Sequence, residues 1–236
     1  MTRKGVLYLI PNTLGEGLVE EVLPAIVPTI VSGLRHFVVE NSKEARRFIK
    51  KVSPDVPQPD LVLSPLHKHI DRTEIQKYLN PCMGGMDMGL LSDAGVPGVA
   101  DPGAEVVALA HKLGIQVRPL VGPSSILLAM MSSGLNGQSF AFNGYLPIEK
   151  SERKKALIKF ERRSKEEGQS QAFIETPYRN NKLFLDLLAL LNPSTLLCVA
   201  ADLTLDSEYI KTHRIDAWKK IKFDLHKRPA IFIIQA

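Results

Sequence analysis

The chain has 236 residues, of which 44% are hydrophobic and 23% charged, so it can form one large or two smaller domains with hydrophobic cores. Its two cysteines, Cys82 and Cys198, exclude a disulfide framework and a CxxC metal site, and no apolar run approaches the roughly 20 residues of a membrane-spanning helix. The net charge of +5 weakly favours an anionic partner such as RNA, and the cysteine usage fits a soluble, cytoplasmic protein.

The first half of the chain alternates between short apolar runs and amphipathic segments. The apolar runs predict strands over Gly5–Ile10, Arg35–Glu40, Leu61–Leu63, Gly89–Ser92 and Ile115–Pro119. The segments between them predict helices over Lys43–Val52, Glu74–Leu79 and Glu105–Leu113, the first capped by Asn41 or Ser42. This βαβα order predicts a parallel or mostly parallel sheet covered by helices.

The second half begins with a helix that Ser124 or Ser125 caps, that continues to Ser133 and that ends at Gly134. Strands are predicted over Phe140–Tyr145, Gln171–Glu175, Leu196–Ala200 and Ala230–Gln235, and helices over Arg153–Glu167 and Asn181–Leu191. The first of these helices is charged and is expected to be solvated, and Trp218–Lys220 falls in a polar stretch. We therefore expect an α/β protein of two α/β lobes, residues 1–120 and 121–236.

Three loops that follow predicted strands break the strand and helix patterns. They are Pro11–Gly17 (PNTLGEG), Ser92–Gly103 (SDAGVPGVADPG) and Gly122–Ser125 (GPSS). PNTLGEG alone matches no phosphate-binding pattern and fits a tight turn, whereas the second loop has two carboxylates, three glycines and two prolines, more than a turn requires. Because the carboxyl ends of parallel strands meet at one edge of a sheet, we expect the three loops to converge on one ligand site.

Several segments resemble the tetrapyrrole-methylase superfamily, and within it the branch of rRNA small-subunit methyltransferase I. SDAGVPGVADPG is similar to that branch's SDAGTPxxSDPG, and RPLVGPSS to its PIPGPSA. Weaker similarity extends over most of the chain, in LYLIPNTLGEG, VENSKEARRFI, SPLHKH, FNGYLP and IETPYR. The segment AADLTLDSEYI departs from the branch, because Ala201, Leu205 and Asp206 stand where the branch has basic residues.

The resemblance implies the tetrapyrrole-methylase fold, with S-adenosylmethionine bound in a cleft between two α/β lobes, and a homodimer. It assigns cofactor contacts to Pro11, Asp93, Gly95, Pro97, Val99, Ser124 and Ser125 of the first half, and to Thr176, Ala200, Pro229 and Ala230 of the second. The three loops contain no Lys or Arg, which suits a sulfonium better than a phosphate.

The expected reaction is methyl transfer to a ribose 2′-hydroxyl of ribosomal RNA in the small subunit. A hydroxyl is a poor nucleophile and gains from a general base, for which His67, His69 and Glu40 are candidates. Each has a plain alternative, since the histidines can be polar loop residues and Glu40 a helix cap. Candidates for RNA contacts are Arg46, Arg72 and Arg179, with a solvated helix face as the alternative for Arg46.

Two other functions remain open at this point. The first is methylation of a tetrapyrrole or another small molecule, for which a wide apolar cleft would be the sign. The second is a cofactor-binding paralogue without catalysis, which the altered segment Ala200–Ile210 and the altered loop Pro11–Gly17 keep open. No metal site is expected.

Overall fold

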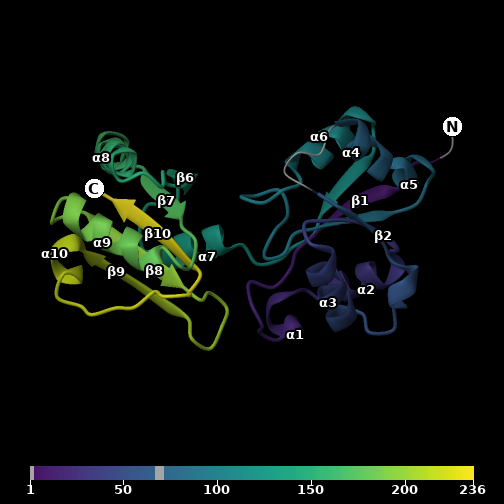
Figure 1. The fold of residues 1–236 in the computed structure, drawn as a ribbon, viewed down its shortest axis with the longest axis horizontal. Coiled ribbons are helices and arrows are strands. Elements are labelled where there is room, and N and C mark those ends of the chain that lie inside the picture. Colours follow the sequence, from purple (N-terminus) through teal and green to yellow (C-terminus); the bar gives the residue numbers. More distant parts are fainter. Residues whose placement is uncertain (1–2, 67–71) are drawn as a thin grey trace. The chain divides into compact units, whose positions relative to one another are not determined.

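The computed structural model of the protein describes residues 3–66 and 72–236 and divides into two compact units, Met1–Ser124 and Ser125–Ala236. Each unit contains one five-stranded sheet with helices packed on both faces (Figure 1). Within the described residues, no helix combines the length and the apolar composition needed to cross a bilayer.

The sheet of the first unit is entirely parallel, as the sequence predicts. Its order is β3-β2-β4-β1-β5, with the strands β1 (Val6–Ile10), β2 (His36–Val39), β3 (Val62–Pro65), β4 (Met88–Leu91) and β5 (Gln116–Pro119). β4 lies in the centre and is buried along its whole length, which is typical of a parallel strand covered on both faces. β1, β4 and β5 are neighbours, so the loops that leave their carboxyl ends start from the same edge.

Two layers of helices cover this sheet, and alternate residues of each strand face one layer or the other. On one face, Phe37 and Val39 pack with the first three helices, whereas Val38 packs with the other three on the opposite face. The first layer consists of α1 (Val19–Val22), α2 (Ile26–Gly33) and α3 (Ser42–Val52). The second consists of α4 (Arg72–Tyr78), α5 (Asn80–Met83) and α6 (Ala104–Lys112). A 3-10 turn at Gln58–Asp60 precedes β3.

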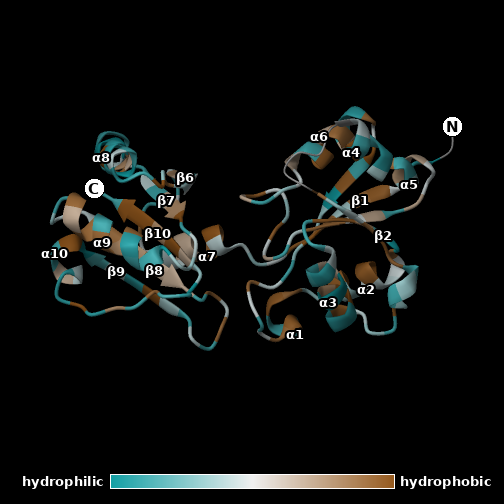
Figure 2. Ribbon diagram, in the orientation of Figure 1, coloured by the Kyte–Doolittle hydropathy of each residue, from teal (hydrophilic) through white to brown (hydrophobic). Residues whose placement is uncertain are grey.

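The second unit has a mixed sheet. Its order is β6-β7-β10-β8-β9, with the strands β6 (Phe140–Tyr145), β7 (Ser170–Ile174), β8 (Leu196–Ala201), β9 (Tyr209–Arg214) and β10 (Ala230–Gln235). Only the β6–β7 pair is parallel, and the other three pairs are antiparallel. The hydrophobic colouring of β8 and β10 in Figure 2 matches their burial in the centre of the sheet.

The helices of the second unit pack on opposite faces of this sheet. α8 (Lys150–Glu167), α9 (Asn180–Leu190) and α10 (Ile215–Trp218) share one hydrophobic core with Phe173 and Phe232 of the strands. On the opposite face, α7 (Ser125–Ser133) packs against β8, β9 and β10. It ends as predicted at Gly134, which has a positive φ of 71°.

The sequence prediction missed α1, α2, α5, β9 and α10. The segment of α1 and α2 contains Pro24 and Pro28, and the edge strand β9 is rich in polar residues, so neither shows a clear periodicity. Trp218 is the largest error, because it is fully buried and its indole N–H donates to the Leu197 carbonyl at 2.8 Å. A single helical turn is enough to bury it, although its neighbours in the sequence are polar.

The charged helix α8 was predicted to be solvated throughout, and one of its basic residues is not. Arg153 is buried, and its Nε and Nη2 atoms lie 2.7 Å and 2.6 Å from Oδ2 of Asp186 on α9. Nη1 donates to the carbonyls of Pro147 and Ile148, which precede the helix. This ion pair fixes α8 against α9 and against the loop that follows β6.

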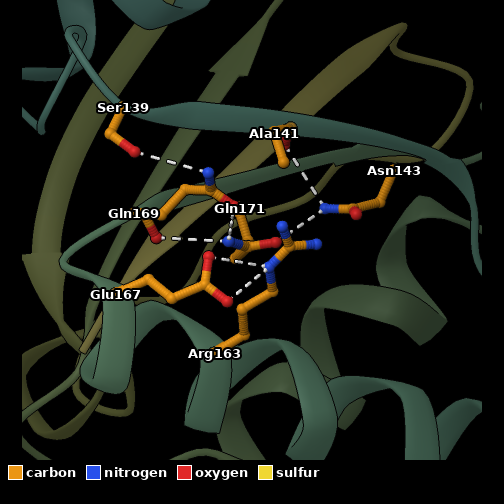
Figure 3. A network of polar contacts seen from close by, with 7 residues as sticks. All are labelled: Ser139, Ala141, Asn143, Arg163, Glu167, Gln169 and Gln171. Carbon is orange, nitrogen blue, oxygen red and sulfur yellow. Dashed lines mark hydrogen bonds and ion pairs between the residues drawn. The ribbon is translucent and has the colours of Figure 1, made fainter.

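A chain of amide side chains joins the edge strand β6 to β7 (Figure 3). The buried Gln171 accepts a hydrogen bond from Asn143 at 3.1 Å and donates to Gln169, which in turn donates to Ser139. β6 is irregular between Phe142 and Tyr145, where its pairing with β7 shifts. The amide chain holds both ends of the β6 edge despite this irregularity.

Candidate functional site

The three loops singled out in the sequence meet at one edge of the first sheet, as predicted. The backbone N–H of Asn12 donates to the carbonyl of Gly95 at 2.8 Å, and its side chain donates to the carbonyls of Ser92 and Asp93 at 3.3 Å and 2.9 Å. Asn12 is buried, and its side chain also accepts from the N–H of Thr13. This residue therefore ties the loop after β1 to the loop after β4.

Glycines make the close approach of these loops possible. A methyl group on Gly122 would lie 2.1 Å from Cβ of Pro11, so the backbone of the loop after β5 packs directly against the proline ring of the loop after β1. Gly95 has φ +67°, and a side chain there would approach Leu14 and the carbonyl of Pro123. Only glycine satisfies both requirements, and the result is a lining made largely of backbone.

Three carboxylates lie at this edge, on the loops after β2 and β4. Glu40 accepts a hydrogen bond from the backbone N–H of Asp93 at 3.2 Å. Partial burial and the nearby Glu40 raise the pKa of Asp93, and burial, Glu40 and Asp93 raise the pKa of Asp101 to about 6. Asp101 thus lies close to two like charges.

The raised pKa of Asp101 gives a testable pH dependence. The folded protein holds this proton more tightly than the unfolded chain, whose Asp pKa is near 3.8, so ionisation destabilises the fold as the pH rises from about 4 through about 6. Asp101→Asn should therefore match the wild-type unfolding temperature at pH 4 and exceed it at pH 7, as measured by calorimetry. A difference that stays constant over this range would contradict the burial and charge contacts assigned to Asp101.

A pocket of about 390 Å³ opens between the loop Asn12–Glu16 and α3, beside Asp93 and Ala94. Arg47 and Lys51 of α3 form its basic wall, with Arg47 paired to Glu16 at 2.8 Å and Lys51 donating to the Gly17 carbonyl at 2.7 Å. These two contacts fasten the loop to α3. The pocket thus has residues of the loop site on one side and charged side chains of α3 on the other, all within the same unit.

The residues predicted to bind RNA or to act as the base in the first unit are not all found at the pocket. Arg46 does not line the pocket, since its guanidinium donates to the carbonyls of Gln58 and Leu61 and braces the turn before β3. Its neighbour Arg47 occupies the pocket wall instead. His67 and His69 lie outside the described residues, and so does the side chain of Arg72, the first residue of α4.

The seven cofactor candidates of the first half of the chain differ in burial, and Asp93 is exposed. Pro11, Gly95 and Pro97 are buried, while Val99 is 49% exposed at the tip of the loop. Ser124 ends the first unit and Ser125 begins α7. Asn12 is the residue of this loop site that the sequence reasoning missed, although its position directly after a buried strand was a usable signal.

The candidates of the second unit lie at one edge of its sheet. Ala230 and Ala201 are paired in the β8–β10 register, which places Ala200 one residue away, and the N–H of Asp202 donates to the carbonyl of Pro229 at 3.0 Å. Thr176 follows β7, whose Ile174 pairs with Ile231. The four cofactor candidates of the second unit therefore lie at the same end of β7, β8 and β10: Thr176, Ala200, Pro229 and Ala230.

Arg179, the remaining RNA candidate, is engaged within the protein. Its Nη2 lies 2.6 Å from Oε1 of Glu175, a buried carboxylate that also accepts from the N–H of Thr176. About a third of the Arg179 side chain stays exposed. The arginine thus holds the loop after β7 to Glu175.

Comparisons with known proteins connect this geometry to named relatives. Over 146 residues the chain is 32% identical to ribosomal RNA small subunit methyltransferase I of Vibrio cholerae, a match that covers 62% of this chain and 49% of that protein. The proteins of the same name from Halalkalibacterium halodurans and from Buchnera aphidicola are 30% and 25% identical, covering 80% and 99% of this chain and 61% and 79% of theirs. These matches thus range from about half to four fifths of the relatives' length.

The fold has a solved counterpart in the crystal structure of the methyltransferase CobJ. It aligns with a TM-score of 0.62 and 16% identity, over 98% of this chain and 94% of that one. No protein-family model matches the chain. At this identity, the likeness establishes the fold and says nothing of the substrate.

The fold and the loop site together define a protein of the tetrapyrrole-methylase fold. In sequence, the chain is similar over most of its length to the ribosomal RNA small subunit methyltransferase I proteins of several bacteria.

Proposed function

We propose that the protein is an S-adenosylmethionine-dependent methyltransferase that acts on a ribose 2′-hydroxyl of ribosomal RNA in the small ribosomal subunit. The observation that carries the proposal is the junction of Asn12, Gly95 and Gly122, which brings together the three loops after β1, β4 and β5. A cytoplasmic location is the expectation that accompanies this substrate.

The loop site fits the cofactor chemically. S-adenosylmethionine would supply an activated methyl group on a sulfonium. Its adenosine part needs backbone donors and acceptors in a narrow slot, which the loops around Pro11, Gly95 and Pro97 offer. The carboxylates of Asp93 and Asp101 have raised pKa values, so a bound cation would stabilise their charged forms.

The acceptor and its base are proposed on the same unit. The pocket beside Asp93 has Arg47 and Lys51 on one wall, two cations that suit a phosphate next to the reacting ribose. Glu40, hydrogen-bonded to the Asp93 backbone, is the described candidate for the base that accepts the hydroxyl proton. The enzyme's main task would be alignment of the hydroxyl with the methyl group and exclusion of water.

The altered segment Ala200–Ile210 favours one second candidate, a cofactor-binding protein without catalysis. This segment lacks the basic residues of its relatives and is held by an ion pair of 2.6 Å between Asp202 and Arg228. Asp202 and Thr204 have positive φ values of 51° and 70°, so the segment has a specific conformation of its own. Binding of S-adenosylmethionine without transfer to any acceptor would identify this second function.

Incubation with methyl-labelled S-adenosylmethionine tests the proposal. Purified small ribosomal subunits that lack the modification should take up label into their RNA, at a ribose that becomes resistant to alkaline cleavage, while a tetrapyrrole acceptor should take up none. Label in the tetrapyrrole alone would overturn the RNA assignment. The same sample in light scattering tests the proposed homodimer.

A further inference from the structure

The positive charge of the chain is concentrated in one helix. Residues 1–124 carry 13 basic and 13 acidic side chains, whereas residues 125–236 carry 17 and 12. α8 alone has eight basic and four acidic residues. Most of the net charge of +5 is therefore located on this helix, far along the sequence from the loop site.

The basic side chains of α8 are displayed on its solvent side. Of the eight, only Arg153 is buried, and much of α8 is coloured as hydrophilic in Figure 2. Three acidic residues pair within the helix, with Lys155, Arg162 and Arg163. The fourth, Glu161, accepts hydrogen bonds from the N–H of Asn192 and from the Thr195 hydroxyl instead.

Lys154, Arg162 and Lys165 form a basic row along one side of the helix. Their spacing of eight and three residues places them on the same face, over a rise of about 16 Å. Among the described residues, neither Lys154 nor Lys165 has an ion-pair partner, and Arg162 has only a loose contact of 3.8 Å with Glu166. A row of this length can meet more than one phosphate of a nucleic-acid strand.

The helix is held rigidly, so the row is presented in a fixed geometry. Glu149 caps its first turn by accepting from the Glu152 N–H at 2.8 Å, and Gly168 ends it with a φ of 61°. The buried pair of Arg153 and Asp186 locks it to α9. Little conformational entropy would be lost in this backbone on binding.

We infer that the basic row of α8, which belongs to the second unit, is an RNA-binding surface that holds ribosomal RNA by its phosphates. The inference rests on the proposed function for the identity of the RNA. A membrane is a poorer fit, because Ile158 is the one large exposed apolar side chain of α8, whereas a helix that lies in a bilayer surface needs a broad apolar face.

The test compares two triple variants that remove the same charge from the same unit. The first is Lys154→Gln, Arg162→Gln and Lys165→Gln. The matched control is Lys211→Gln, Arg214→Gln and Lys222→Gln, which also removes two lysines without ion pairs among the described residues and one arginine in a loose exposed pair, Arg214 with Asp216. Binding to small-subunit RNA is measured at several salt concentrations, and thermal unfolding checks that both variants fold.

The α8 variant should bind RNA about tenfold more weakly or worse, and the slope of log affinity against log salt should fall by about 2, near 0.7 for each lost phosphate contact. The control should change affinity less than twofold, and both variants should bind S-adenosylmethionine like the wild type. Equal losses in both variants, or binding only to anionic phosphatidylglycerol vesicles, would overturn the inference. A wild type that binds RNA through α8 but transfers no methyl group would overturn the proposed function alone.

Discussion

Gly122→Ala should weaken binding of S-adenosylmethionine by about tenfold or more, a free-energy loss of at least about 1.4 kcal/mol. The added methyl group would lie 2.1 Å from Cβ and 2.3 Å from Cγ of the Pro11 ring, distances that require one of the two loops to move. The ring of Pro11 is rigid and buried, so the loop after β5 must shift away from the loop after β1. Isothermal titration calorimetry measures the effect directly.

The matched control for this change is Gly137→Ala in the second unit. A methyl group at Gly137 meets nothing within 4 Å, and its φ is not positive. This variant should bind the cofactor with wild-type affinity. If Gly122→Ala also binds with wild-type affinity, the contact between the loops after β1 and β5 does not shape the cofactor site.

Asp186→Ala should lower the free energy of unfolding by about 3 kcal/mol or more, because it leaves the buried Arg153 guanidinium without its partner. Only 5% of the Arg153 side chain and 18% of the Asp186 side chain are exposed, so water cannot replace the lost carboxylate fully. The change should appear as a lower urea midpoint with little change in slope.

Two variants separate the loss of this ion pair from other effects. Glu166→Ala removes one partner of an exposed pair on the same helix, and it should cost less than about 1 kcal/mol. The double change Arg153→Met and Asp186→Leu removes both charges and should recover much of the stability, since no charge is left buried and unpaired. A double variant as unstable as Asp186→Ala would show that packing volume, rather than charge, is the cause.

The fold of the first unit was predictable from the sequence because its strands are short, apolar and separated by amphipathic helices. In α3, for example, Asn41 accepts from the Lys43 N–H, as its cap position predicts, and Ala45, Phe48 and Ile49 face the core. The convergence of the three loops followed from the parallel order of β1, β4 and β5. Local pattern and global topology agree for these elements, whereas α1, α2 and α5 of the same unit were not predicted.

What the sequence did not reveal depends on contacts between distant residues. The burial of Arg153 requires Asp186 on another helix, and the burial of Trp218 requires a carbonyl of β8. Arg46 and Arg47 are neighbours with the same chemistry, yet one braces a backbone turn and the other lines the pocket. No local pattern distinguishes such residues, because their roles are set by the partners that the fold brings to them.

The central claim is that the loops after β1, β4 and β5 bind S-adenosylmethionine. Isothermal titration of the intact protein with S-adenosylmethionine tests it most directly, with Asp93→Ala and Gly137→Ala measured in parallel. We predict saturable binding at or below micromolar concentrations for the wild type and Gly137→Ala, and weaker binding for Asp93→Ala. Absence of wild-type binding at millimolar cofactor would contradict the claim.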